Sequence, residues 1–199
     1  MTKKKTLSLI VILIISGNTF CQEYKKVIEK QFTEYLNSIV AKNFEVSMNY
    51  IPEDFFKFVP KKQMILLMQK TFNNPDLEFR LSDPKIIEIK DAELIEGKYY
   101  SLITYSNYMN MKFLDNDTIK ETEAGHKQRI GLTKLALENN FGKENVKYDQ
   151  QTDFFEIYSE KKVYAISDNS QLHWKFIVLE KNQKTILEKI LPKQLTEKL

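Results

Sequence analysis

The sequence predicts a single α+β domain in which N-terminal helices precede an antiparallel sheet. Apolar residues recur every three or four positions from Tyr24 to Val40, which is typical of an amphipathic helix. Tyr, Ile, Thr and Met are frequent from Tyr99 to Phe113, as in a β-strand. The 199 residues include only five glycines and five prolines, and no low-complexity tract suggests a flexible linker. These three observations together indicate one packed unit.

The N-terminus predicts an export signal. The apolar run from Leu7 to Ile15 follows the basic residues Lys3, Lys4 and Lys5. This run is too short for a bilayer core, which needs about 20 apolar residues, and a basic start is typical of secretory signals. We therefore expect residues 1–21 to form a signal peptide and the protein to be periplasmic or extracellular.

Cys21 leaves two ways of processing open. In the favoured one, Thr19 and Cys21 are small enough for cleavage before Gln22. In the minority alternative, Cys21 is the acylated residue of a bacterial lipoprotein, although Phe20 is larger than the residue that normally precedes such a cysteine.

Removal of the signal changes the charge of the chain. Residues 22–199 keep 27 of the 30 basic residues and all 27 acidic residues, so this part is formally neutral. A neutral chain has no overall field for nucleic acid, so no nucleic-acid partner is expected, nor a membrane span after signal removal. It also lacks cysteine, and its 178 residues suit one domain that buries about 70% of its unfolded surface.

Two helices are expected before the sheet. The first runs from Tyr24 to Val40, and the second covers Lys61 to Phe72, with Met64, Leu67, Met68 and Phe72 on one face. The sequence Asn-Asn-Pro at 73–75 ends the second helix.

Two strands follow within residues 85–113, joined by a turn near Glu96 and Gly97. The second strand alternates in character. Its odd-numbered face carries apolar side chains, namely Ile103, Tyr105, Met109, Met111 and Phe113. Its even-numbered face is half polar, which indicates a sheet with helices on one face.

The C-terminal half is expected to contain a helix, a meander and a final helix. The helix spans about Lys127 to Phe141. Three strands are predicted at Phe154–Tyr158, Val163–Ser167 and Leu172–Glu180, with Ser-Glu-Lys-Lys and Asp-Asn-Ser-Gln as the turns between them. Apolar residues from Ile186 to Leu191 suggest a short helix that packs back on the body.

The order of these elements resembles exported bacterial members of the nuclear-transport-factor-2-like superfamily. The phrases that carry the resemblance are VPKKQMILLMQKTFNNP, HWKFIVLE and ILPKQL, and it covers most of Gln22 to Pro192. It implies a cone-like fold in which a curved antiparallel sheet wraps around the N-terminal helices and leaves a cavity at its open end. Members include isomerases, dehydratases, ligand-binding accessories and association modules, so the resemblance does not choose a function. The 127–141 helix departs from the simplest family pattern, which leaves the strand order open.

Residues suited to acid–base catalysis are few. His173 alternates with Trp174 on the last predicted strand, where the fully apolar face points inward, so we expect His173 to point outward. His126 lies in a polar stretch and is expected to be solvated. Asp153 and Glu156 could form a carboxylate pair near Tyr158 or Tyr164, but a solvated strand edge explains them better.

The sequence offers only weak candidates for ligand binding. Met109 and Met111 with Tyr105 could line an adaptable apolar pocket, since Met fills irregular space and Tyr adds a polar tip. The full set of candidates is Tyr105, Met109, Tyr158, Tyr164 and His173. No catalytic residue is assigned. Neither a phosphate-binding loop nor a metal motif is present, and Asp115–His126 lacks the ligands of a calcium loop, so no cofactor and no metal are expected.

The favoured hypothesis is an exported, non-enzymatic protein that binds a small apolar ligand or a protein partner. One alternative is an isomerase or hydro-lyase that uses a buried carboxylate or histidine in the cone cavity. A second alternative is a structural module that associates with itself as a homodimer through a sheet face.

Overall fold

The computed structural model describes residues 6–114, 121–169 and 172–197, with side chains from Glu23 onward except Lys181. The elements of the N-terminal half are α1 (Thr6–Val40), α2 (Phe44–Ser47), η1 (Met48–Tyr50), η2 (Glu53–Lys57), α3 (Lys61–Phe72), β1 (Leu77–Ile89), β2 (Glu93–Ile95) and β3 (Lys98–Phe113). The remaining elements are α4 (Glu123–Phe141), η3 (Lys143–Asn145), β4 (Val146–Asp149), β5 (Phe154–Ser167), β6 (Lys175–Val178), η4 (Lys181–Gln183), α5 (Lys184–Ile190) and α6 (Lys193–Thr196). The predicted α+β class is confirmed.

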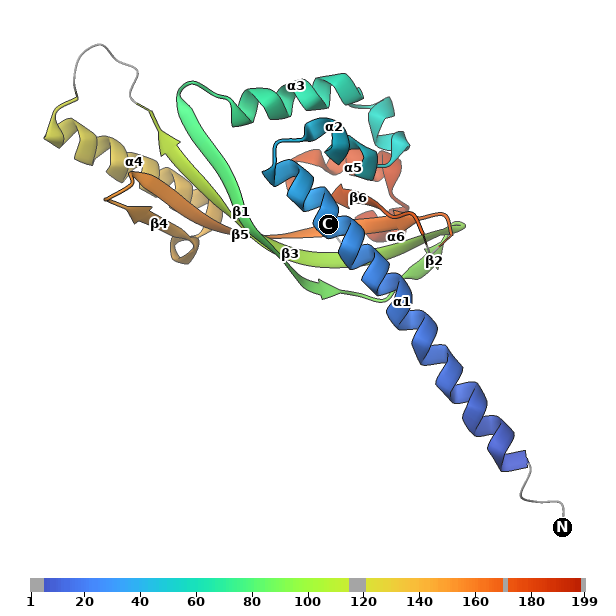
Figure 1. Ribbon diagram of the computed structural model, residues 1–199. Coiled ribbons are helices and arrows are strands. Elements are labelled where there is room, and N and C mark those ends of the chain that lie inside the picture. Colours follow the sequence, from blue (N-terminus) through green and yellow to red (C-terminus); the bar gives the residue numbers. More distant parts are fainter. Residues whose placement is uncertain (1–5, 115–120, 170–171, 198–199) are drawn as a thin grey trace.

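An open antiparallel sheet forms the centre of the molecule (Figure 1). Its main order is β1-β3-β5-β4, with β2 on β3 and β6 on β5. The long strands β3 and β5 pair without interruption from Tyr99↔Ser167 to Met111↔Phe155. Edge strands β4 and β6 pair with opposite ends of β5, so β5 has an uncovered edge between them in the described part of the chain.

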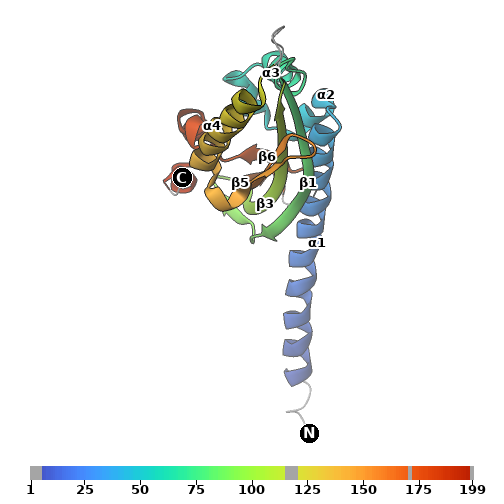
Figure 2. The same ribbon diagram turned by 90° about the vertical axis from the view of Figure 1, so that its left-hand side faces the viewer.

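Helix α1 packs on one face of the sheet and continues beyond it toward the N-terminus (Figures 1 and 2). Phe32 is completely buried, and its ring centroid lies 5.1 Å from that of Tyr105 and 4.9 Å from that of Phe176. The surrounding buried cluster contains Ile28, Tyr35, Leu36, Ile103, Val163, Ala165 and Trp174. The predicted inward orientation of Trp174 and the odd face of β3 is therefore confirmed.

The other face of the sheet carries helices α5 and α6. Leu187, Leu191 and Leu195 are buried against it, because their spacing of four residues gives this segment one apolar side. The sheet residues beneath them are Tyr100, Tyr164, Ile166 and Ile177. The expectation of helices on only one face is thus wrong, since the C-terminal leucines cover the end of the second face.

Helix α4 lies at the far end of the sheet, next to β4 and β5 (Figure 1). It begins four residues before the expected Lys127, because the side chain of Thr122 accepts a hydrogen bond from the N–H of Gly125 as an N-cap. It ends at Phe141, as predicted, before Gly142 with φ +91°. Within the described residues, no helix combines the length and the apolar character that spanning a membrane requires.

The predicted meander of three strands is wrong in part. Ser159–Lys162, expected as a turn, are extended and pair with Thr104–Asn107 of β3, so two predicted strands form the single strand β5. The third predicted strand shortens to Lys175–Val178, and β4 was not predicted. Pairing along the long strand β3 outweighs the turn propensity of these polar residues.

Strand β1 begins at Leu77, earlier than expected, and is irregular in its middle. Its register with β3 shifts between Ser82 and Lys85, where Asp83 has φ +49° and Pro84 follows. A bulge of this kind increases the local twist of the strand. The predicted turn at Glu96 and Gly97 is confirmed, with φ values of +50° and +81° that match a two-residue hairpin turn.

Candidate functional site

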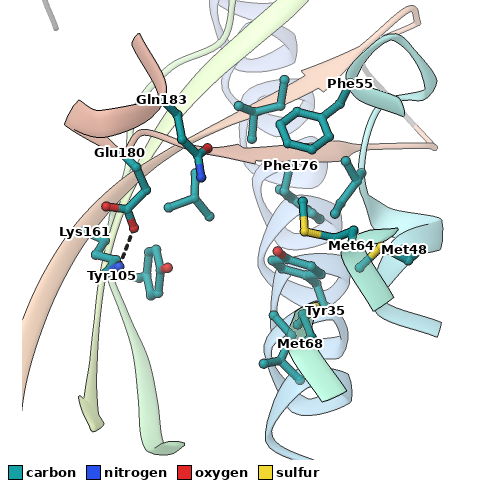
Figure 3. A pocket seen from close by; sticks show the side chains of 14 residues that line it. Tyr35, Met48, Phe55, Met64, Met68, Tyr105, Lys161, Phe176, Glu180 and Gln183 are labelled. Atoms are coloured by element: carbon teal, nitrogen blue, oxygen red, sulfur yellow. Dashed lines mark hydrogen bonds and ion pairs between the residues drawn. The ribbon is translucent and has the colours of Figure 1, made fainter. Parts of the chain in front are cut away.

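Two apolar cavities of about 260 and 250 Å³ lie between the sheet and the N-terminal helices. Both cavities are bordered by Ile39, Met68, Tyr105 and Lys161, so they are adjacent compartments. The larger one is also lined by Tyr35, Met48, Ile51, Phe55, Met64, Phe176, Ile177, Val178, Glu180 and Gln183 (Figure 3). Together they reach the size of small-molecule sites, which begin at about 300 Å³.

The helices α1 and α3 each contribute a pair of cavity residues spaced four positions apart in the sequence. Tyr35 and Ile39 lie on one face of α1, and Met64 and Met68 lie on one face of α3, so each pair points the same way. Tyr105 comes from the odd-numbered face of β3 beneath them. Methionine side chains are flexible and polarisable, which lets the wall formed by α3 adapt to different apolar shapes.

Two tyrosine hydroxyls point into this cavity without a protein partner. Tyr35 and Tyr105 are only 8% and 7% exposed, and among the described residues neither O–H has a hydrogen-bond partner. Figure 3 shows both hydroxyls directed into the space between the rings. Burial raises the pKa of Tyr35 to about 12 and raises the pKa of Tyr105 further, so both phenols stay protonated at neutral pH.

A charged pair lies on the polar side of the cavity. Lys161 Nζ donates a hydrogen bond to Glu180 Oε1, and the Gln183 side chain lies beside them (Figure 3). Both side chains are about one third exposed, because they also line an outer groove of about 880 Å³. This groove follows the uncovered edge of β5, from Asn140 and Phe141 of α4 to Lys184 and Leu187 of α5.

The structure brings together only some of the predicted ligand-binding residues. Tyr105 lines both cavities, and Met109 lines the smaller one. Tyr158 lies on the opposite sheet face, with its ring 5.6 Å from that of Tyr108. Tyr164 is buried beneath α5 and α6. His173 is exposed, as expected from its alternation with Trp174.

Several cavity residues were not among the predicted candidates. Tyr35 and Met64 stand at the three- and four-residue spacing of apolar residues in their helices. This spacing is the same for a closely packed position and for a cavity wall, so it does not distinguish them. Lys161 fell in a predicted turn, although its odd number matches the buried residues of β5. Alternation with Val163 and Ile157 is the signal that could have placed Lys161 on the inner face.

A separate polar cluster joins the start of α4 to the turn before β5. His126 lies 3.3 Å from Glu121 through Nδ1 and 3.5 Å from Asp153 through Nε2. Tyr148 donates a 2.5 Å hydrogen bond to Asp153. Burial, followed by the hydrogen bond to Asp153, raises the pKa of Tyr148 to about 12.

This cluster uses residues that the sequence had suggested for other roles. The Asp153 carboxylate, which the sequence suggested as a partner of the Glu156 carboxylate, instead accepts a hydrogen bond from Tyr148. No group of three or more His, Cys, Asp or Glu side chains in the described ranges has the arrangement of a metal site. His126 and its partners do not line the three cavities above, which leaves the α1 face of the sheet as the candidate site.

Comparison with known proteins adds little about the function. No protein family matches the sequence, and no solved structure matches the chain. The chain is 27% identical over 116 residues to an uncharacterised candidate transmembrane protein of Dictyostelium discoideum. That match covers 55% of the chain and only 2% of the length of the relative.

Proposed function

We propose that this protein is a non-enzymatic binding protein that holds a small amphipathic ligand between α1, α3 and the sheet. The carrying observation is the cavity pair, whose walls are mainly apolar and carry a few polar groups: two phenols without a partner among the described residues, the Lys161–Glu180 ion pair, and the side chains of Ser82, Asn107 and Gln183. Sites for small molecules have this composition, since apolar walls supply affinity and a few polar groups fix the orientation.

The methionine content of the wall supports binding over simple packing. Met48, Met64 and Met68 line the larger cavity from three separate turns of helix. A packed interior would be filled to a density that leaves few voids larger than a water molecule. Two adjacent cavities of about 250 Å³ are thus better explained by an occupant of the site.

The proposal includes the cone-like wrapping and the export of the chain. The long strands β3 and β5, the bulge in β1 and the helix α1 on one face support a cone of the nuclear-transport-factor-2-like kind. Export rests on the basic and apolar N-terminal residues 3–15, and the predicted processing at Cys21 involves side chains outside the described part. The mass and the N-terminal residue of the protein made in its own cell would test it.

Binding can be measured with a set of apolar probes of increasing size. We expect thermal melting temperature to rise with probe concentration, and native mass spectrometry to show one bound probe. Each further buried CH₂ group should strengthen binding by about 0.8 kcal/mol, or about fourfold, until the cavity is filled. A chain that neither carries nor gains any probe would contradict the proposal.

A pair of variants on α3 locates the binding site. Met68→Trp places a large ring where both cavities meet. Leu67→Trp changes a side chain that was predicted on the apolar face of this helix but is 61% exposed, because it points away from the sheet. We expect Met68→Trp to bind the probes at least tenfold more weakly, with an unchanged circular dichroism spectrum. Leu67→Trp should bind like the parent. Equal binding by both variants would place the probes elsewhere.

One observation favours an isomerase or hydro-lyase as a second candidate. Glu180 is a carboxylate at the wall of an apolar cavity, the arrangement that a general base requires. Its ion pair with Lys161 opposes this role, since the carboxylate that would take up a substrate proton is already bonded to an ammonium. Turnover of a bound carbonyl compound that is lost in Glu180→Gln would favour the enzyme.

Self-association of the chain is tested separately. Light scattering at several concentrations gives the mass of the particle with and without a probe. A monomer that binds the probe supports the cavity proposal, whereas a dimer that is independent of the probe would favour the structural module.

A further inference from the structure

The polar side of the larger cavity carries two phenols, one ammonium, one carboxylate and the amide of Gln183. Tyr35 and Tyr105 each present an O–H that no described residue accepts. The Lys161 ammonium carries three donors, and the Glu180 carboxylate accepts one of them. Against this set, Glu180 is the only carboxylate among the residues that line the cavity. A ligand that accepts several hydrogen bonds fits these groups best.

The position of Lys161 separates an outer and an inner space. Its side chain borders both inner cavities and the outer groove, and Glu180 borders the groove and the larger cavity. A ligand head group that enters from the groove therefore meets the ammonium first. Tyr105 lies beside Lys161, whereas Tyr35 and the methionines lie on the opposite side of the space (Figure 3).

We propose that the ligand is an amphiphile with a carboxylate head, which replaces Glu180 at Lys161 and places its apolar chain among Met48, Met64 and Met68. This inference rests on the proposed function and adds the chemical class of the ligand. Charge complementarity supports it, since an ammonium and phenolic donors form short, strong bonds to a carboxylate. Glu180 acts as the internal anion that holds Lys161 until the ligand arrives.

Decanoic acid and decanol distinguish this inference from the general proposal. The two probes have the same chain, but only the acid is anionic at neutral pH. Isothermal titration calorimetry should show that the acid binds at least tenfold more tightly than the alcohol, as expected for a bond to a charged group. Binding of neither probe would refute cavity binding itself. Equal binding of both would refute only the carboxylate head.

Glu180→Gln gives a result that a merely structural ion pair would not give. Removal of the competing anion should tighten binding of decanoic acid by threefold or more and leave decanol unchanged. If the pair only stabilised the fold, the variant would bind both probes equally well or less well. Weaker binding of the acid by Glu180→Gln would overturn the inference.

Two lysine variants test which cation holds the head group. Lys161→Met should lose at least tenfold in affinity for decanoic acid and nothing for decanol. Lys162→Met is the matched control, because Lys162 is exposed and lines only the outer groove. Circular dichroism shows whether each variant is folded. Equal losses in the two variants would mean that the acid is held by general charge and not by the cavity.

Discussion

Tyr105→Phe should stabilise the protein, although it removes a polar group from a buried tyrosine. The ring of Tyr105 packs edge-on against Phe32 at 5.1 Å, and this contact is kept in the variant. The hydroxyl is lost, but no described residue bonds to it. Folding transfers this O–H from water to a site that holds no acceptor among the described residues, which costs about 1–3 kcal/mol.

The expected gain lies at the lower end of this range, because the hydroxyl borders a cavity and is not enclosed by apolar atoms. We expect the free energy of unfolding to rise by about 1 kcal/mol. For a chain of this size, that corresponds to a rise of about 2–4 °C in melting temperature. Urea unfolding and calorimetry would each measure it.

Tyr148→Phe is the matched control, since it also removes a phenol hydroxyl. The Tyr148 hydroxyl, however, donates a hydrogen bond to Asp153 at 2.5 Å. Loss of this bond should lower the free energy of unfolding by about 1 kcal/mol. The two variants should thus shift the melting temperature in opposite directions. A loss of stability in Tyr105→Phe equal to that in Tyr148→Phe would refute the reasoning, because it would show that the Tyr105 hydroxyl is satisfied in the folded protein.

Three further predictions concern the core, alkaline pH and a turn. Phe32→Ala should lower the free energy of unfolding, measured with urea, by about 3–5 kcal/mol, because the ring is fully buried. A decrease below about 1 kcal/mol would contradict the core as described. Tyr35 has a folded pKa of about 12 against 10.0 for the free side chain, so its ionisation should leave stability unchanged below pH 10 and lower it by about 1.4 kcal/mol per pH unit between pH 10 and 12. Burial also raises the pKa of Tyr105 and of Tyr148, so these tyrosines add to the fall, and Tyr35→Phe should make it shallower by about 1.4 kcal/mol per pH unit. Phenolate absorbance follows the ionisation, and an unchanged slope in Tyr35→Phe would exclude Tyr35 as a source. Residues Glu96 and Gly97 of the hairpin turn both have positive φ. Glu96→Asn should therefore stabilise the protein by about 0.5 kcal/mol, and Gly97→Ala should destabilise it by a similar amount or more. If thermal melting showed that both variants lower stability, the turn type would be contradicted.

The helices and the inner face of β3 could be predicted from the sequence because their periodicity is local. The spacing of apolar residues in α1 and the alternation from Ile103 to Met109 each follow from the geometry of one element. The continuity of β5 could not be predicted in this way. Glu160 and Lys162 are solvent-exposed, and what keeps them extended is the pairing with β3, which is distant in sequence.

The candidate site was predictable only in part, for a related reason. Tyr105 was found because its alternation placed it on the apolar face of a strand. Tyr35 shares the spacing of fully packed neighbours, and only the three-dimensional arrangement shows that its hydroxyl borders a cavity. Lys161 and Glu180 are 19 residues apart, and their meeting depends on the antiparallel return of the chain through β6.

The irregularity in the middle of β1 has a consequence for the behaviour of the protein at high concentration. β1 is an outer strand of the sheet, and such strands can recruit a strand from a neighbouring molecule and begin aggregation. Pro84 has no N–H to donate, and Asp83 turns the backbone out of the extended conformation beside it. A continuous run of intermolecular hydrogen bonds along this side would be broken at both residues. The bulge in β1 thereby also protects the sheet from growing by addition of further molecules.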